Sequence, residues 1–307
     1  MKRWAGKRVV ILGAARQGIA LTRYLLAKGA HVVLSDDKAA GGLDLTSLPA
    51  VSALTLALGG HPLSLLDDCE LLCLSGGVPI NLPIVVEARR RGVPISNDAD
   101  MFFELCAAPI IGITGSAGKT TTTTLLGEML RAHESGSGSP TRPVWVGGNI
   151  GNPLIEHVDD IGAHDHVVME LSSFQLDLMT RSPHIACITN ITPNHLDRHG
   201  TMAAYTAAKK RILDFQGDAD LQVLNADDPV SSTLNSGAST AWFSLRAEPR
   251  GDGAWLDEDG FLRLRIRKNR IEDTICHRRE LLLMGDHNIL NVLAAAVLAA
   301  SAGAGLD

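Results

Sequence analysis

The sequence predicts an α/β protein in which a Rossmann-like amino-terminal domain precedes a P-loop ATPase-type domain with a mostly parallel sheet. Near the start, Val9–Leu12, a glycine-containing turn and Ile19–Ala27 have the residues of a strand, a turn and a helix. Further on, Pro109–Thr114, Gly115–Gly118 and Lys119–Leu130 repeat that order, with a lysine directly after the glycines. A chain of 307 residues is too long for one ordinary domain, so we expect domains at 1–107 and 108–307.

Composition excludes several classes of protein. The content of 45% apolar and 20% charged residues is typical of a globular protein, and no apolar run reaches the ~20 residues that span a bilayer. The start passes directly into a strand, so we expect a cytoplasmic protein that contacts no membrane. A formal charge of -6 argues against a nucleic-acid partner. Five scattered cysteines indicate free thiols, and we expect a monomer.

The first domain begins with a unit that resembles dinucleotide-binding sites. Its turn spans Gly13–Gly18, and its second strand, His31–Ser35, ends at Asp36 and Asp37. An NAD site would use Asp36 on a ribose, whereas a purely structural turn is the alternative, because Ala15 stands where the second glycine is usual. The pattern alone leaves both open.

Further elements complete this domain. Leu71–Leu74 is a predicted buried strand, and Ser75 and Gly76 follow it at the carboxyl edge of the sheet, where ligands bind in open α/β folds. The remaining predicted elements are a helix, a strand and a helix, at Pro83–Arg91, Val93–Ser96 and Asp98–Leu105.

The second glycine-containing loop predicts a phosphate site. Backbone N–H groups and the positive end of the helix would face one point, while Lys119 adds charge and Thr120 a hydroxyl for Mg2+. A strand over 165–170 ends at Glu170, which could hold Mg2+ directly or through water, or could be a solvated strand end. The alternative for the loop is a glycine-rich turn with an exposed lysine.

The rest of the second domain alternates strands and helices. A polar loop is predicted over His133–Arg142, and Asn149 lies in a glycine-rich turn after the strand Val144–Val146. The other predicted strands are Ile185–Ile191 and Leu221–Leu224, and Asp227 or Asp228 after the latter is expected to face the nucleotide side. One helix is predicted over Thr201–Phe215, and Leu283–Asn291 enters an alanine-rich helix that continues to about Ala300. A hairpin is predicted over Trp255–Arg267. His195 follows a strand edge, and Asn288 and Asn291 share a helix face that could meet an adenine edge.

Several motifs resemble those of the Mur ligases, the ATP-dependent amino-acid-adding enzymes of bacterial cell-wall synthesis. Gly112, Gly115 and Gly118 before Lys119 resemble that family's variant phosphate loop. Glu-Leu-Ser-Ser-Phe-Gln-Leu at 170–176 and Gly-Gly-Asn-Ile-Gly at 147–151 are similar to the D-glutamate-adding branch. Two departures are Gly76 in place of a proline and Asn194 in place of an aspartate.

The resemblance implies roles for individual residues. It implies catalytic roles for Lys119, Lys209 and His195, and metal ligands in Thr120, Glu170, His195 and Lys209, with Lys209 carbamylated. The implied ATP-binding residues are Gly115, Ser116, Ala117, Gly118, Lys119, Thr120, Thr121, Asn288 and Asn291. The implied UDP-sugar-binding residues are Gly13, Ala14, Ala15, Arg16, Gln17, Gly18, Asp36, Asp37, Ser75, Gly76 and Asn149.

The resemblance also implies a reaction. ATP, with two Mg2+ ions, would activate the carboxylate of UDP-N-acetylmuramoyl-L-alanine, and the amine of D-glutamate would then form the amide. The family's third domain, which binds D-glutamate, has no counterpart before Asp307, so we expect these residues alone to be inactive. The alternatives are a folylpolyglutamate synthase-like ligase and a non-catalytic module that binds a UDP sugar or nucleotide.

Overall fold

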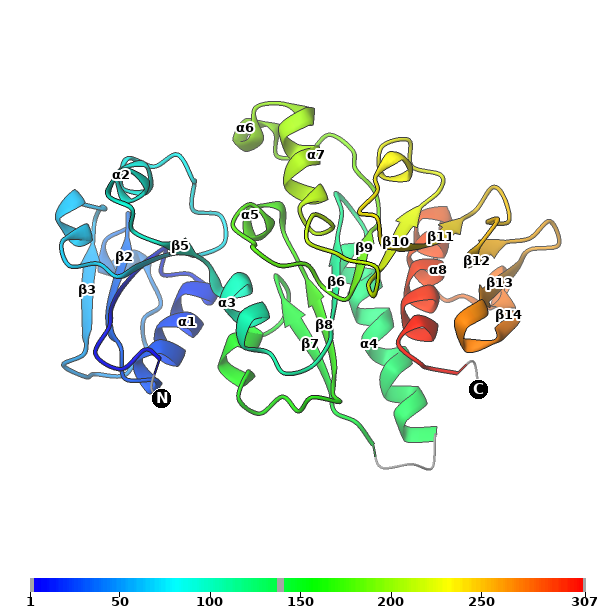
Figure 1. Ribbon diagram of the computed structural model, residues 1–307, viewed down its shortest axis with the longest axis horizontal. Coiled ribbons are helices and arrows are strands. Elements are labelled where there is room, and N and C mark those ends of the chain that lie inside the picture. The colour runs from blue at the N-terminus through cyan, green and yellow to red at the C-terminus, as the bar shows by residue number, and fades with distance from the viewer. Residues whose placement is uncertain (1–2, 137–140, 306–307) are drawn as a thin grey trace. The chain divides into compact units, whose positions relative to one another are not determined.

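The computed structural model describes residues 3–136 and 141–305 and divides the chain into two compact units. The first unit comprises Met1–Cys106, Asn152–Asp160 and Asp177–Met179, and the second comprises Ala107–Gly151, Ile161–Leu176 and Thr180–Asp307. Each unit is built around its own sheet (Figure 1). The predicted mixed α/β class with parallel sheets is confirmed.

The first unit has a five-stranded parallel sheet in the order β3-β2-β1-β4-β5. Its strands are β1 Arg8–Leu12, β2 His31–Asp36, β3 Leu54–Leu58, β4 Leu71–Leu74 and β5 Ile95–Ser96, and its helices are α1 Arg16–Ala27, α2 Pro83–Arg91 and α3 Asp98–Leu105. Strands β1 and β4 are apolar and almost wholly buried, as expected for the centre of a parallel sheet. Because β1, β2 and β4 run in parallel and in register, the residues that follow them meet at one edge.

The second unit has a nine-stranded sheet in the order β14-β13-β12-β11-β10-β9-β6-β8-β7. The strands are β6 Ile110–Thr114, β7 Val144–Gly148, β8 His166–Glu170, β9 Ile185–Ile188, β10 Leu221–Asn225, β11 Ser239–Ser244, β12 Asp252–Leu256, β13 Phe261–Ile266 and β14 Ile271–His277. From β7 through β8, β6, β9, β10 and β11 to β12, each strand pairs in parallel with the next, whereas β13 is antiparallel to both β12 and β14. This places β6, which leads into the phosphate loop, in the interior of the sheet.

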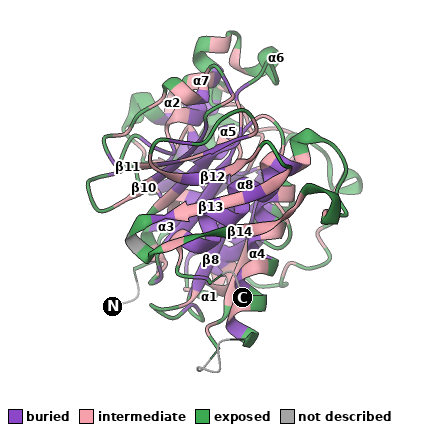
Figure 2. Ribbon diagram, turned by 90° about the vertical axis from the view of Figure 1, so that its right-hand side faces the viewer, coloured by how far each residue is buried: buried purple, intermediate pink, exposed green. Residues whose placement is uncertain are grey.

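Five α-helices are described in this unit: α4 Lys119–Gly136, α5 Ser173–Leu176, α6 Leu196–His199, α7 Met202–Lys210 and α8 Asp286–Ser301. Short 3-10 turns connect elements of both units, at Ala40–Gly42, Leu63–Leu66, Leu154–His157, Ser231–Thr233, Arg267–Asn269 and Arg278–Glu280. Helices α4 and α8 pack against each other and share one apolar core with the sheet. Figure 2 shows buried residues concentrated in the strands and α6 exposed.

Some predicted boundaries are wrong. Helix α4 continues to Gly136, so the predicted loop over His133–Arg142 begins with helix, and its residues 137–140 lie outside the described residues. Glu134 explains the extension, because its buried carboxylate accepts hydrogen bonds from the backbone N and Nε of Arg142, both at 2.8 Å. Helix α7 ends at Lys210, short of the predicted Phe215.

Candidate active site

The predicted phosphate loop, Gly115–Gly118, lies between β6 and α4, in the predicted order of strand, loop and helix. Gly118 has a φ of +82°, and a Cβ there would lie 2.3 Å from Asn291 Oδ1. At Gly115, a Cβ would lie 1.9 Å from Thr189 Oγ1. Only glycine fits at these two positions, since any side chain would collide with the neighbouring segments. The loop is therefore pressed closely against the end of β9 and the start of α8.

Two lysines reach this loop from different helices. Lys119 Nζ donates to Gly115 O at 3.0 Å and to Ser116 O at 3.4 Å, and burial lowers the pKa of Lys119. Lys209, on α7, is 2% exposed, and its Nζ donates to Gly115 O at 2.7 Å. Burial, and then the charge of Lys119, lower the pKa of Lys209 to about 7 against an opposing effect of Glu170. The predicted catalytic lysines are thus brought together.

Glu170 and Thr120 form the part of the site that could hold a divalent cation. Glu170 is 1% exposed at the end of β8; its Oε2 accepts from Thr120 Oγ1 at 2.8 Å and its Oε1 accepts from Asn149 Nδ2 at 2.7 Å. Carboxylate and hydroxyl oxygens are donors that suit Mg2+, which usually keeps water and phosphate ligands as well. Among the described residues, no group of three or more His, Cys, Asp or Glu side chains is placed to hold a metal ion. Thr120 and Glu170, two of the predicted Mg2+ ligands, thus lie next to each other at the start of α4 and the end of β8. The UDP-sugar role of Asn149 stays a prediction.

His195 occupies a different environment from Glu170. It is exposed, has a φ of +51° at the start of α6, and its ring lies edge-on to Phe174 at 5.5 Å between centroids. Within the described residues, no hydrogen bond joins its ring to Glu170, Thr120 or Lys209, so its metal role stays a prediction.

A cluster that sequence reasoning missed surrounds His199. Its ring stacks on Phe174 at 5.3 Å and its Nε2 is 2.9 Å from Ser173 Oγ. The same ring lies 5.2 Å from Tyr205, whose hydroxyl is 3.1 Å from Ser116 Oγ. Burial, and then Lys209, lower the pKa of His199. Ser173 and Phe174 on α5, His199 on α6 and Tyr205 on α7 are thus connected to Ser116 in the loop. No spacing in the sequence indicated this cluster.

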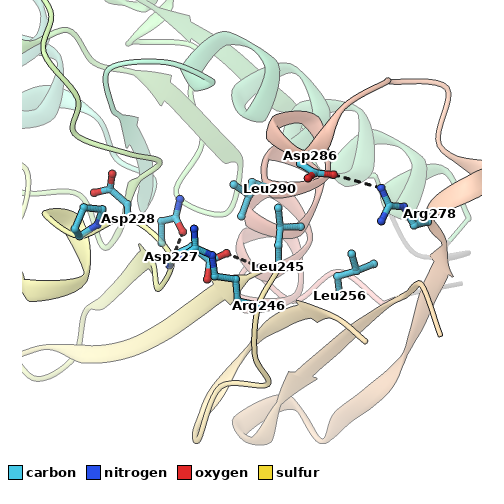
Figure 3. Close-up of a pocket in the computed structure, with 10 residues that line it drawn as sticks. Asp227, Asp228, Leu245, Arg246, Leu256, Arg278, Asp286 and Leu290 are labelled. Atoms are coloured by element: carbon cyan, nitrogen blue, oxygen red, sulfur yellow. Dashed lines mark hydrogen bonds and ion pairs between the residues drawn. The ribbon is translucent and has the colours of Figure 1, made fainter. Parts of the chain in front are cut away.

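Helix α8 joins the loop to a cavity. Asn291 Oδ1 accepts from Thr122 Oγ1 at 3.3 Å, and Asn291 Nδ2 donates to Asn288 Oδ1 at 3.2 Å. Leu290, the residue before Asn291, lines a cavity of about 560 Å3 (Figure 3). This volume is in the range of small-molecule sites.

The cavity has polar and apolar walls. Asp227 and Asp228, one of which the sequence predicts on the nucleotide side, both line the cavity, and Asp227 Oδ2 accepts from Leu245 N at 2.6 Å. Arg278 and Asp286 line another wall of the cavity and form an ion pair, with 3.3 Å between Arg278 Nη2 and Asp286 Oδ1 (Figure 3). Leu245, Arg246, Leu256 and Arg278 were not predicted, because they come from strand ends and a connection that carry no motif.

In the first unit, the predicted residues gather at the carboxyl edge of the sheet. Gly13 N donates to Ser35 O at 2.7 Å, and Gly13, at a φ of +93°, has no room for a Cβ, which would lie 2.9 Å from Val78. Gly18 is also obligatory, since a Cβ would lie 1.9 Å from Gly13 O. Ala14, Ala15, Arg16 and Gln17 form the turn and the start of α1. Gly76 follows Ser75 at the same edge, and a Cβ added at Gly76 would lie 3.6 Å from the side-chain amide of Gln17.

Asp36 and Ser75 show different degrees of hydrogen bonding at this edge. Burial raises the pKa of Asp36, but hydrogen bonds from Ala14 N at 2.7 Å and Lys38 N at 2.9 Å favour the charged carboxylate and hold the pKa below its usual value. Ser75 is 4% exposed and its Oγ has no hydrogen-bond partner within the described residues. Such a buried hydroxyl is stabilised by a polar ligand atom or a water. Asp37, in contrast, is exposed.

No helix in the described part of the chain is long and apolar enough to cross a membrane.

Family models match both units. The model described as "Mur ligase middle domain" matches residues 113–299, and "Mur ligase MurD-like, N-terminal domain" matches residues 7–97. The first of these matches covers more than half of the 307 residues.

Two relatives share the same name. The UDP-N-acetylmuramoylalanine--D-glutamate ligase of Symbiobacterium thermophilum is 45% identical over 98% of this chain and 65% of its own length. The protein of that name from Pelotomaculum thermopropionicum is 39% identical over 99% of this chain and 65% of its own. The chain thus spans about two thirds of the length of these relatives.

Solved structures share the fold. The UDP-N-acetylmuramate:L-alanyl-gamma-D-glutamyl-meso-diaminopimelate ligase of Neisseria meningitides aligns with a TM-score of 0.64 at 19% identity, over 99% of this chain and 96% of that chain. The UDP-N-acetylmuramate-alanine ligase of Thermotoga maritima aligns with a TM-score of 0.55 at 23% identity, over 98% of this chain and 66% of that one. At these identities the likeness concerns the fold alone.

Proposed function

Because this chain belongs to the Mur ligase family, we propose that it provides the nucleotide-binding and UDP-sugar-binding parts of a D-glutamate-adding ligase. The reaction would join D-glutamate to UDP-N-acetylmuramoyl-L-alanine at the expense of ATP. One observation supports this proposal most strongly. Thr120 donates a hydrogen bond to Glu170 beside the loop Gly115–Gly118, and Lys119 and Lys209 both donate to the Gly115 carbonyl of that loop. The relatives' shared name supports the choice of amino acid.

The proposed chemistry has two steps. The carboxylate oxygen of the muramoyl-alanine attacks the γ-phosphorus of ATP, which releases ADP and forms an acyl phosphate. The amine of D-glutamate then attacks the acyl carbon, the C–O bond to phosphate breaks, and the amine loses a proton. Lys119 and the first turn of α4 would stabilise negative charge on the transferred phosphoryl group.

In this proposal Thr120 and Glu170 would hold one Mg2+, and His195 and a carbamylated Lys209 would hold a second; bound Mg2+ would neutralise phosphate charge. A carbamate forms when a neutral lysine amine attacks CO2 and loses a proton. The burial of Lys209 and its lowered pKa support this, because they favour the neutral amine.

The two units would hold different ligands. We assign 1–107 to the UDP sugar, supported by the glycines of the first turn and by the buried Ser75 hydroxyl, which has no hydrogen-bond partner in the described part of the chain. We assign 108–307 to ATP, with the adenosine in the cavity that Leu290 and Asp228 line. A cytoplasmic location, a monomeric state and the lack of a nucleic-acid partner are further parts of the proposal.

The test is substrate dependence of ADP formation by the intact gene product that carries this sequence. The proposal requires that ADP appears only with the muramoyl nucleotide and D-glutamate together, and that L-glutamate or L-alanine does not replace D-glutamate. Binding of both nucleotides without ADP formation would instead indicate a non-catalytic module.

A further inference from the structure

The backbone of the phosphate loop is attached to the segment that follows β9. Ser116 N donates to Asn190 O at 2.9 Å. Ala117 N donates to Asn190 Oδ1 at 3.0 Å, and Asn190 Nδ2 donates back to Ala117 O at 3.0 Å. One carboxamide therefore holds both sides of the Ala117 residue.

Neighbours of Asn190 complete the attachment. Thr189 Oγ1 donates to Ala117 O at 2.6 Å, and Ser116 Oγ donates to Thr192 O and accepts from Thr192 N, both at 2.9 Å. The close approach of Thr189 to Gly115 leaves no room for a Cβ at Gly115. The loop conformation is thus set largely by Thr189–Thr192.

This arrangement changes which donors can reach a phosphate. The N–H groups of Ser116 and Ala117 point to Asn190, and Thr122 N donates to Gly118 O at 2.9 Å. The backbone donors left for a phosphate are therefore those of Lys119, Thr120 and Thr121 in the first turn of α4, because the first N–H groups of a helix have no acceptor inside it. Lys119 begins that turn and adds its charge.

We propose that Asn190 is a positioning residue for ATP: its carboxamide fixes the Ala117 peptide, and this directs the start of α4 and Lys119 at the phosphates. The inference rests on the proposed function and adds to it the device that shapes the loop. The rival interpretation is that Asn190 blocks a phosphate donor, in which case its removal would tighten ATP binding.

The experiment measures Mg-ATP affinity by calorimetry, and KM and kcat in the ligation assay, for Asn190→Ala and Asn190→Asp. Asn190→Ala removes both side-chain hydrogen bonds to Ala117, so we expect ATP binding to be roughly 10- to 30-fold weaker. Asn190→Asp keeps an acceptor for Ala117 N but cannot donate to Ala117 O, so it also weakens ATP binding by about tenfold. The KM for the muramoyl nucleotide stays at the parent value.

Asn235→Ala is the matched control. Asn235 is an exposed asparagine in the same unit, and its side chain likewise makes two hydrogen bonds, both accepted by Oδ1, from Gly237 N at 2.9 Å and Gln222 Nε2 at 3.1 Å. Its ATP affinity should equal that of the parent. If Asn190→Ala does not fold, Asn190→Asp decides the question.

The outcomes separate the two claims. A parent that binds no ATP contradicts the proposed function. A parent that binds ATP, together with Asn190 variants that bind it equally well or more tightly, overturns the positioning role alone.

Discussion

Lys119 and Lys209 donate hydrogen bonds to the same carbonyl oxygen, that of Gly115, at 3.0 and 2.7 Å. Two ammonium groups at one acceptor repel each other, so the arrangement favours the neutral form of the more buried one. Lys209 is that residue, and its pKa is lowered to about 7. This relationship supports two roles. Lys119 would keep the positive charge that stabilises phosphate, and Lys209 would supply the neutral amine that a carbamate requires.

The first prediction concerns stability and pH. The pKa of Lys209 is about 7 when folded and near 10.5 when unfolded, so between these values the unfolded state binds more protons. Stability relative to a neutral Lys209→Met variant should therefore rise as the pH increases from 7 to 10.5. Urea unfolding of both chains in CO2-depleted buffer measures the difference, and a gap independent of pH would contradict the lowered pKa.

The second prediction is that Lys119→Ala abolishes phosphoryl transfer by the intact protein without unfolding it, because the side chain reaches the loop and not the apolar core. The rate of ADP formation should fall by a factor of about 10² or more. Lys210→Ala is the control, since Lys210 pairs with Asp214 on the solvent side of α7. Parent-like ADP formation by Lys119→Ala would remove the phosphate-loop assignment.

A third prediction separates the metal role of Glu170 from its structural role. Glu170→Gln keeps the size of the side chain and an oxygen for Thr120 or Asn149, but it removes the charge that attracts Mg2+. The Mg2+ concentration for half-maximal activity should increase about tenfold or more, which is roughly 1.4 kcal/mol of binding. Glu128→Gln, at an exposed pair with Arg131, should not change it. An unchanged Mg2+ titration for Glu170→Gln would show a purely structural carboxylate.

The fourth prediction tests carbamylation directly. Lys209→Ala should lose nearly all activity, because neither amine nor carbamate remains, and short carboxylates such as formate or acetate should restore part of it. The measurement is the ligation rate against added carboxylate, with Lys119→Ala as a variant that carboxylates should not rescue. Full activity of Lys209→Ala without additive would show that the residue has no such role.

The fifth prediction concerns the first unit. Residues 1–307 should bind UDP-N-acetylmuramoyl-L-alanine without ATP, and Asp36→Asn should weaken that binding about tenfold, because the Ala14 turn loses a charged acceptor at 2.7 Å. Asp44→Asn, at an exposed turn, should bind like the parent. Calorimetry that detects NAD binding and no uridine nucleotide binding would favour a dinucleotide site.

Local patterns predicted the parts of the fold that have a strong local signal. The β6, loop and α4 sequence carries apolar strand residues, glycines and helix formers in order, so its structure could be predicted. Strands β3, β11 and β14 could not, because β3 and β14 are partly exposed edge strands and β11 mixes polar and apolar residues. Pairing with a neighbouring strand stabilises them, and this is absent from a local window.

The site was predictable where a motif carries it and not where tertiary contacts build it. Lys119, Thr120 and Glu170 follow strand ends of a parallel sheet, whose carboxyl ends meet. Asn190 and His199 act through contacts with residues 73 and 26 positions away, at Ala117 and Ser173. Such contacts depend on how loops from separate strands pack, which spacing along the chain does not reveal.

The most direct test of the proposed ligation follows the oxygen atoms of the muramoyl-alanine carboxylate. We label both carboxylate oxygens with 18O and measure the released phosphate by mass spectrometry after turnover with ATP and D-glutamate. Attack of the carboxylate on ATP, followed by displacement of phosphate by the amine, predicts one 18O atom in each phosphate and one in the amide product. Unlabelled phosphate, or no amide product from the intact protein, would contradict the account.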